Sequence, residues 1–193
     1  DNGILSPTSE TSQVVKAAAM VLSDAGARGD EARPTGIELS YDAMIDAWNR
    51  CDPPLVKQLL GAAGTSQEET TLQWLFEVPA ATSEDIVNAV RSMDSCRSKM
   101  LSFMTDYDVI LCPVNAFPAM TQGSENPEDL RAFSYTMAHN LTGWPGAVVR
   151  GGTSPEGLPI GIQIVARPWR EDFALAVAKL LENELGGFQA PDI

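Results

Sequence analysis

Histidine, the usual base beside a catalytic serine, is scarce in this sequence. The 193 residues include a single histidine, His139. A hydroxyl becomes a strong nucleophile only when a neighbouring base removes its proton, so a Ser-His-Asp triad would have to use this residue. His139 falls at the end of an expected helix, where a hydrogen-bonded or dipole-stabilising role is the simpler interpretation. We therefore assign no catalytic residue within the chain.

The motifs of several other catalytic classes are absent from the sequence. It contains no G-x-S-x-G elbow, no S-x-x-K, no H-E-x-x-H and no Walker loop. The Gly/Ser-rich stretch 151–154 is short and favours a turn. The four lysines fall on expected helices and are interpreted as solvated. Lys99 follows Ser98, but adjacent helical residues do not face each other.

The three cysteines, Cys51, Cys96 and Cys112, are widely spaced and form no C-x-x-C pair. This pattern favours buried, reduced thiols over a disulfide framework. It offers no zinc site, and we expect neither a metal nor an organic cofactor.

Composition limits the class of protein. With 44% hydrophobic and 20% charged residues, the chain resembles one globular domain. A net charge of −13 argues against nucleic acid as a partner. No apolar run approaches the roughly 20 residues of a membrane span, and no signal peptide is recognisable, so we expect a cytoplasmic protein without a membrane partner.

Two paired strands are the clearest elements. Short apolar runs at 147–149 and 160–166 are joined by a loop rich in Gly and Pro. In the second run, Ile160, Ile162 and Ile164 alternate with Gly161, Gln163 and Val165, as expected for a strand. Residues 109–112 form a third apolar run, which ends at Pro113 and is typical of a strand covered on both faces.

Periodic apolar residues predict helices between and around these strands. The first carries Val14 and Ala18, with Ser6-Pro7 as its expected start and Gly26 as its end. The second is capped by Ser40 and ended by Asp52-Pro53-Pro54. The third begins with a capping box at Thr82–Asp85 and buries a stripe of Ile86, Val90, Met93, Met100 and Met104. The fourth starts at Asn126 and carries Leu130, Phe133 and Met137, and the last starts at Glu171 and ends at Gly186.

These segments include too few strands for a complete helix-covered sheet. Only three convincing strands accompany about seven helical segments, whereas such a sheet ordinarily has about five. Part of the sheet is therefore expected outside the chain.

Three sequence stretches resemble one family. Asn140-Leu-Thr-Gly-Trp-Pro-Gly, followed by Gly157-Leu-Pro-Ile-Gly-Ile-Gln, is similar to the C-terminal signature of the amidase signature family, the serine hydrolases that cleave carboxamides. Asp108-Val-Ile-Leu-Cys-Pro113 with Pro118-Ala119 resembles a later strand and pocket loop, and Asp1-Asn2-Gly3 with Pro7 resembles a segment that follows a sheet strand. The sequence departs from the family at Arg150, where an apolar residue or Pro is more usual.

The resemblance implies a fold class and a reaction. Residues 1–193 would be the C-terminal portion of an amidase domain, an α/β fold in which one α/β/α layered domain has a mixed sheet covered by helices, with the N-terminal half missing. The intact enzyme would hydrolyse a small-molecule carboxamide to an acid and ammonia or an amine. Its Ser-Ser-Lys apparatus would lie in the missing N-terminal half, so this chain alone should be inactive.

The resemblance also points to candidate substrate-binding residues. The loop after the strand that ends at Pro113 would lie near the acyl side of the site, although it could equally be a simple cover. The end of the fourth helix supplies a second candidate group, in which Asn140 could instead satisfy backbone groups and Trp144 could be core or rim. The candidates are Val114, Asn115, Phe117, Met120, Asn140, Thr142 and Trp144.

Two alternatives remain open from the sequence. The chain could be part of the glutaminase subunit of a tRNA-dependent amidotransferase, which is similar in these stretches. It could also be a non-catalytic module that binds a partner through an uncovered sheet edge. The sequence also leaves open a homo-oligomer.

Overall fold

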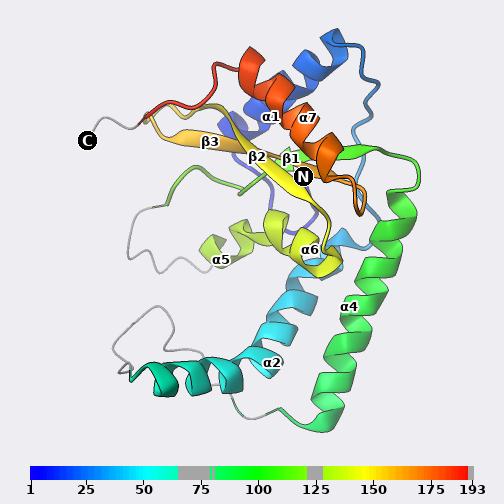
Figure 1. The fold of residues 1–193 in the computed structure, drawn as a ribbon, viewed down its shortest axis with the longest axis vertical. Coiled ribbons are helices and arrows are strands. Elements are labelled where there is room, and N and C mark those ends of the chain that lie inside the picture. The colour runs from blue at the N-terminus through cyan, green and yellow to red at the C-terminus, as the bar shows by residue number, and fades with distance from the viewer. Residues whose placement is uncertain (65–78, 80, 121–127, 191–193) are drawn as a thin grey trace.

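The computed structural model describes residues 1–64, 79, 81–120 and 128–190. In chain order the elements are α1 (Ser9–Asp24), a 3-10 turn (Ile37–Leu39), α2 (Ser40–Ala63), α4 (Ser83–Phe103), β1 (Val109–Pro113), α5 (Glu128–Ala132), α6 (Ser134–Thr142), β2 (Gly146–Thr153), β3 (Pro159–Ala166) and α7 (Glu171–Glu184). Figure 1 shows the helices on both sides of a small sheet. None of these helices is both long enough and apolar enough to cross a membrane.

The described strands form one antiparallel sheet in the order β1-β3-β2. The predicted hairpin is confirmed, but β2 is longer than expected because it continues through Arg150 to Thr153. The prediction of a turn at 151–154 is therefore wrong for its first three residues. The turn lies at 154–158, where the Ser154 N–H donates to the Leu158 carbonyl at 2.8 Å.

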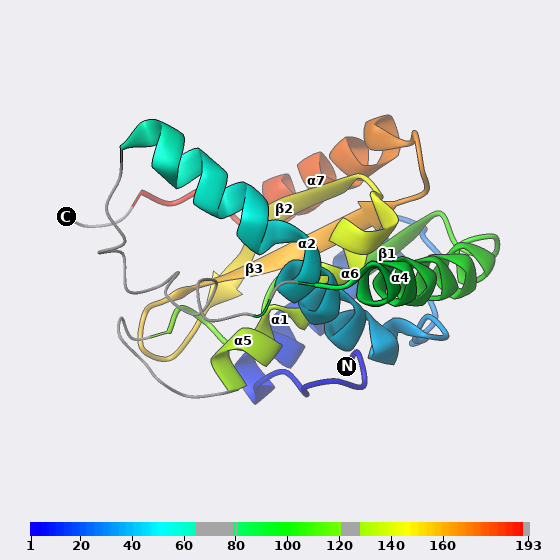
Figure 2. The ribbon, with the colours of Figure 1, turned by 90° about the horizontal axis from the view of Figure 1, so that it is seen from below.

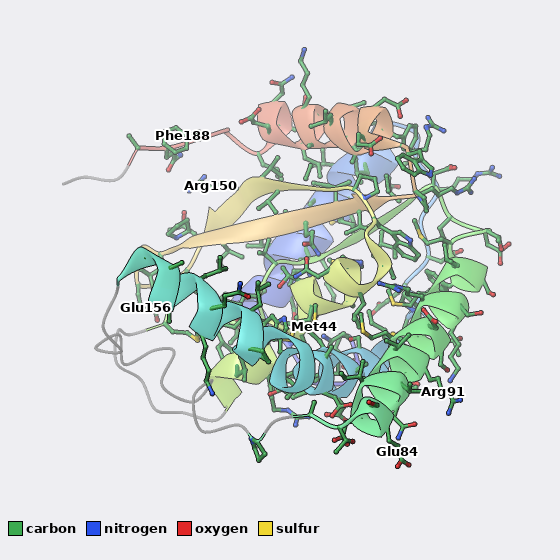
Figure 3. The ribbon with its side chains drawn as sticks, turned by 60° about the horizontal axis from the view of Figure 1, so that its bottom comes forward. Met44, Glu84, Arg91, Arg150, Glu156 and Phe188 are labelled. Atoms are coloured by element: carbon green, nitrogen blue, oxygen red, sulfur yellow. The ribbon has the colours of Figure 1, made fainter. Side chains whose placement is uncertain are left out.

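Helices cover both faces of this sheet (Figures 1 and 2). Helices α1 and α7 pack on one face, where Ala18, Ile162 and Leu181 belong to one buried cluster. Helix α6 lies on the opposite face, backed by α2 and α4, and a second cluster joins Met100, Met137 and Val165. Figure 3 shows Met44 between α2 and α6, whereas Glu84 and Arg91 lie on the outer side of α4. These observations confirm the predicted class of helix-covered α/β sheet.

Local hydrogen bonds explain where two of the helices begin. The expected cap at Ser6 is wrong, because the Thr8 side chain accepts from the Thr11 N–H and α1 starts at Ser9. The capping box of α4 is confirmed, with reciprocal bonds between Thr82 and Asp85. The expected stripe is only partly right: Met100 and Met104 are buried, but Ile86 and Val90 are exposed.

Helix α2 does not end at its prolines. It runs for 24 residues through Pro53 and Pro54 to Ala63, and it ends at Gly64 in the left-handed conformation. Figure 1 shows a bend near the middle of α2. A bend is expected there, because proline has no backbone N–H to donate to the preceding turn of the helix. Ser40 is the first helical residue rather than the cap, and its side chain makes no capping bond.

The predicted fourth helix is two helices. Helix α5 ends at Ala132 and α6 begins at Ser134, so Phe133 lies at the junction. Met137 is buried as expected, whereas Leu130 and Phe133 are exposed. The expected start at Asn126 lies outside the described residues. Helix α7 begins at Glu171 as predicted and ends at Glu184, two residues before Gly186.

Candidate functional site

A hollow of about 270 Å³ opens beside the loop that follows β1. Four of the seven candidate residues line it: Val114, Asn115, Phe117 and Met120. Its remaining lining comes from the loop itself, from the junction of α5 and α6, and from the two other strands. We call it the loop hollow, and it is lined by Val114, Asn115, Phe117, Pro118, Ala119, Met120, Phe133, Val148, Pro159, Ile160 and Gly161.

Hydrogen bonds fix the loop that forms this wall. The Asn115 side-chain oxygen accepts from the Phe117 N–H at 3.1 Å, which closes a tight turn of the Asx type. The Ala116 N–H donates to the Ala132 carbonyl at 3.2 Å, and the Ala116 carbonyl accepts from Thr8 at 2.9 Å. The loop is therefore anchored to both α5 and the start of α1, which leaves the Phe117 side chain partly exposed at the hollow.

A glycine keeps one side of the hollow open. A Cβ atom at Gly161 would lie 3.0 Å from Cγ2 of Val114 and 3.4 Å from Cγ1 of Val148. Contacts this short require the neighbouring side chains to move. The absence of a side chain at Gly161 thus sets the space between β3, β2 and the loop.

The loop hollow is apolar, and none of its lining residues is titratable. Phe133 and Val148 are 42% and 57% exposed and form part of its rim. Small-molecule sites are typically concave and apolar, with few polar groups that fix orientation. Asn115 is the amide-bearing side chain among these residues. The arrangement suits an apolar group of a ligand and supplies no acid, base or nucleophile of its own.

The other three candidates lie outside the loop hollow. Asn140 is exposed on α6. The Thr142 hydroxyl donates to the His139 carbonyl at 3.1 Å, a bond that closes the end of the helix. Trp144 is buried in the core cluster, and its ring centroid lies 6.1 Å from that of His139. Of the core and rim interpretations of Trp144, the structure supports the core.

A half-buried cysteine and a buried histidine lie together on the same face of the sheet as α6. Sγ of Cys112 is 4.0 Å from Nε2 of His139. This contact was not predicted from the sequence, because the two residues are 27 positions apart. The Gln163 side chain donates to this sulfur at 3.4 Å and to the Tyr135 carbonyl at 3.3 Å. Among the described groups, Nδ1 of His139 has no hydrogen-bond partner.

Burial sets the protonation of this pair. Desolvation raises the pKa of Cys112 to about 11 and lowers the pKa of His139 to about 4. Near pH 7 the thiol is therefore protonated and the imidazole neutral, which is the opposite of an activated thiolate–imidazolium pair. Of the two roles expected for His139, hydrogen bonding and stabilisation of the helix dipole, the second does not fit near pH 7, because it requires a charged ring.

Comparison with known proteins identifies the family. The sequence model of the family described as Amidase matches residues 2–175. This chain belongs to the amidase family. Among curated relatives, a glutamyl-tRNA(Gln) amidotransferase subunit of Roseobacter denitrificans is 26% identical over 177 residues, which cover 89% of this chain and 36% of that protein. A putative amidase of Synechocystis is 27% identical over 160 residues, covering 77% of this chain and 31% of that protein.

Solved structures confirm the amidase signature fold. A crystal structure of an amidase superposes with a TM-score of 0.80 at 21% identity, covering 95% of this chain and 43% of that one. A 6-aminohexanoate cyclic dimer hydrolase gives a TM-score of 0.77 at 21% identity, with the same coverage. The chain thus spans less than half the length of these relatives.

The described part of this amidase-family chain contains no candidate metal centre. Lys16, Lys57, Lys99 and Lys179 are exposed on helices, as predicted. The Ser154 hydroxyl donates to the Glu156 carboxylate at 2.7 Å and accepts from the Leu158 N–H at 3.3 Å, so it stabilises the hairpin turn. These side chains have structural or solvated positions.

Proposed function

We propose that this chain is the C-terminal portion of an amidase that hydrolyses small carboxamides, and that the loop hollow forms the wall against which the acyl group of the substrate packs. The reacting hydroxyl and its base lie in the remainder of the enzyme. The observation that carries the proposal is an anchored, apolar hollow that lacks titratable groups, within a chain that belongs to the amidase family.

The geometry supports a positioning role. Binding residues are often placed on loops carried by a rigid strand, and here the loop follows β1 directly. Phe117 and Met120 offer an aromatic and a flexible apolar surface, and the Asn115 amide has a fixed orientation. In this arrangement the first four candidates contact the acyl group. A substrate role for Asn140, Thr142 and Trp144 remains a prediction.

The proposal is tested in the complete enzyme that carries this chain. Phe117→Ala should lower kcat/KM for an amide with a large acyl group, such as benzamide, by about tenfold or more, since apolar pocket contacts of this size contribute about 1–3 kcal/mol. The same variant should affect acetamide much less, because its methyl group does not reach across the hollow. Steady-state kinetics on the two amides gives the ratio.

Leu175→Ala is the matched control. Leu175 is an exposed apolar residue on α7, and α7 packs on the opposite face of the sheet from α6. Equal effects of Phe117→Ala on both amides would contradict the pocket assignment. Labelling of a serine by a fluorophosphonate probe in the isolated 193-residue chain would contradict the placement of the reacting groups.

A second candidate is the glutaminase activity of a tRNA-dependent amidotransferase. The relative from Roseobacter denitrificans favours it, because its name assigns it to such an amidotransferase. In that case partner subunits would supply the tRNA-binding surface, since this chain carries a net charge of −13. Affinity purification with mass spectrometry and an assay for glutamine hydrolysis would distinguish the two candidates.

A further inference from the structure

Asn115 is the one side chain among the described residues of the loop hollow that can donate a hydrogen bond to a ligand. The other lining residues are Val, Phe, Pro, Ala, Met, Ile and Gly, and their side chains carry no N–H or O–H group. The hydrogen-bonding state of the Asn115 amide therefore decides which polar group of a ligand a side chain can recognise here.

The two ends of the Asn115 amide have different roles. Its Oδ1 atom accepts from the Phe117 N–H at 3.1 Å, and this bond assigns the oxygen end of the group. In the part of the chain that the structure describes, the Nδ2 atom has no hydrogen-bond partner. An amide NH₂ group donates and does not accept. The free end of Asn115 thus requires an acceptor atom on the ligand.

The backbone of the same turn offers no competing donor at residues 116–118. The Phe117 N–H is used by Asn115, and the Ala116 N–H donates to the Ala132 carbonyl at 3.2 Å. Pro118 has no backbone N–H. A ligand oxygen that reaches this turn is therefore recognised through Nδ2 of Asn115.

The loop hollow does not suit a charged acyl group. None of its described lining residues is titratable, so a charge placed there would have no counter-ion. Moving an unpaired ion from water into apolar surroundings is costly. The net charge of −13 adds a general repulsion of anions. An amino-acid amide such as glutamine carries both an ammonium group and a carboxylate, and neither finds a partner in this hollow.

We infer that Asn115 is a specificity-determining residue, and that the substrates are neutral carboxamides whose apolar acyl group carries a hydrogen-bond acceptor, such as a ketone or ester oxygen, bound by Nδ2 of Asn115. This inference rests on the proposed function, since it takes the loop hollow as the wall for the acyl group. It also separates the two candidate functions, because glutamine lies outside this substrate class.

The inference is tested by steady-state kinetics on the complete enzyme that carries this chain. The substrates are 3- and 4-acetylbenzamide and the matching isopropenylbenzamides, in which C=CH₂ replaces C=O at nearly the same shape. Asn115→Asp keeps an oxygen that accepts from the Phe117 N–H but removes the donor. The ratio of kcat/KM for acetyl over isopropenyl substrates should fall by about fivefold or more for at least one isomer pair. Differences in intrinsic reactivity cancel, because both enzymes meet the same substrates.

Asn88→Asp is the matched control, since it makes the same change of charge. Asn88 is exposed on α4 and does not line the loop hollow. This variant should leave the ratio unchanged. Turnover of both substrates with an equal ratio in wild type and Asn115→Asp would overturn the inference and leave the proposed function intact. The carboxylate analogues, 3- and 4-carbamoylbenzoate, should be poorer substrates than the acetylbenzamides by about tenfold or more. The reverse order would overturn the assignment to neutral substrates.

Nuclear magnetic resonance supplies a measurement that needs neither turnover nor a folded variant. In the complete wild-type protein with nitrogen-15 in its asparagine side chains, 3- or 4-acetylbenzoate, a reaction product, should shift the Asn115 NH₂ signals more than the matching isopropenylbenzoate does. Equal shifts, or no shift, would overturn the inference. A selective shift in a protein that hydrolyses none of the benzamides would contradict the proposed function and leave the Asn115 contact intact.

Discussion

Gly151 lies where two core side chains leave no room for a methyl group. A Cβ atom there would lie 2.1 Å from Cδ1 of Ile162 and 2.7 Å from Cγ1 of Val14. We predict that Gly151→Ala lowers the free energy of unfolding by about 1–3 kcal/mol, because overpacking forces side chains and backbone to shift. Urea unfolding measures the change.

The control is another glycine of the same strand. At Gly146 the nearest atom to an added Cβ would be the Ile164 carbonyl oxygen, at 3.8 Å, an ordinary contact. Gly146→Ala should therefore leave the free energy of unfolding nearly unchanged. Equal losses from the two variants would show that the cost comes from the strand backbone rather than from the contacts of Gly151.

His139 should make stability depend on pH. In the folded chain burial lowers the pKa of its ring from 6.5 to about 4. Between these values the unfolded chain binds more protons than the folded chain, so this residue's contribution to stability is lost as pH falls from about 6.5 to about 4. Its full size is on the order of 3 kcal/mol, since each pKa unit corresponds to about 1.4 kcal/mol.

The difference between the wild type and His139→Leu isolates this contribution. Urea unfolding at pH 7.5 and pH 5 should show a smaller decrease for the variant, by about 2 kcal/mol. Carboxylates titrate in both proteins, so their effect cancels. The same decrease in both proteins would mean that the ring is protonated equally in the folded and unfolded states.

At the scale of elements, the capping box fixes the start of α4. The Asp85 N–H donates to the Thr82 hydroxyl at 3.2 Å, and the Thr82 N–H donates to the Asp85 carboxylate at 2.9 Å. Thr82→Ala should destabilise the protein by about 1 kcal/mol, because a helix donor loses its acceptor. Thermal unfolding measures the loss. Ser83→Ala, one residue later, is the control and should change little. A larger loss from Ser83→Ala would contradict this assignment of the cap.

Elements with local signals could be predicted from the sequence. The hairpin of β2 and β3 follows from the alternation of Ile160, Ile162 and Ile164, and α4 follows from its capping box. The course of α2 could not be predicted in this way. Two prolines normally end a helix, but here the helix continues to Ala63. Its contacts with α4 and α6 come from residues distant in sequence, and packing of this kind can outweigh a local propensity.

The candidate site was predicted for a different reason. Val114, Asn115, Phe117 and Met120 were identified through a family resemblance, and the structure brings them to one hollow. Hydrophobic periodicity alone would not have distinguished these four residues from those of any other loop. The proximity of Cys112 and His139 depends on how α6 packs against the sheet. No local pattern encodes that distance.

At the scale of the whole molecule, the net charge of −13 should oppose compaction. We predict that Tm rises by on the order of 2 °C when the NaCl concentration increases from about 0.01 M to about 0.15 M, because the Debye length falls from about 30 Å to about 8 Å. Differential scanning calorimetry gives the shift. Replacing NaCl by KCl should give the same shift, and a Tm that decreases with salt would contradict the repulsion.

The bend in α2 divides that helix into two parts with different thermodynamic character. Beyond Pro54, Leu55 and Leu59 are 55% and 58% exposed, and Figure 1 shows this segment directed away from the sheet. The short part of α2 that follows Pro54 has little intrinsic helical stability in water. The terminal turns of α2 should therefore open in brief local events while the other described helices stay folded, and a protease added in trace amounts should cleave these turns before it cleaves those helices.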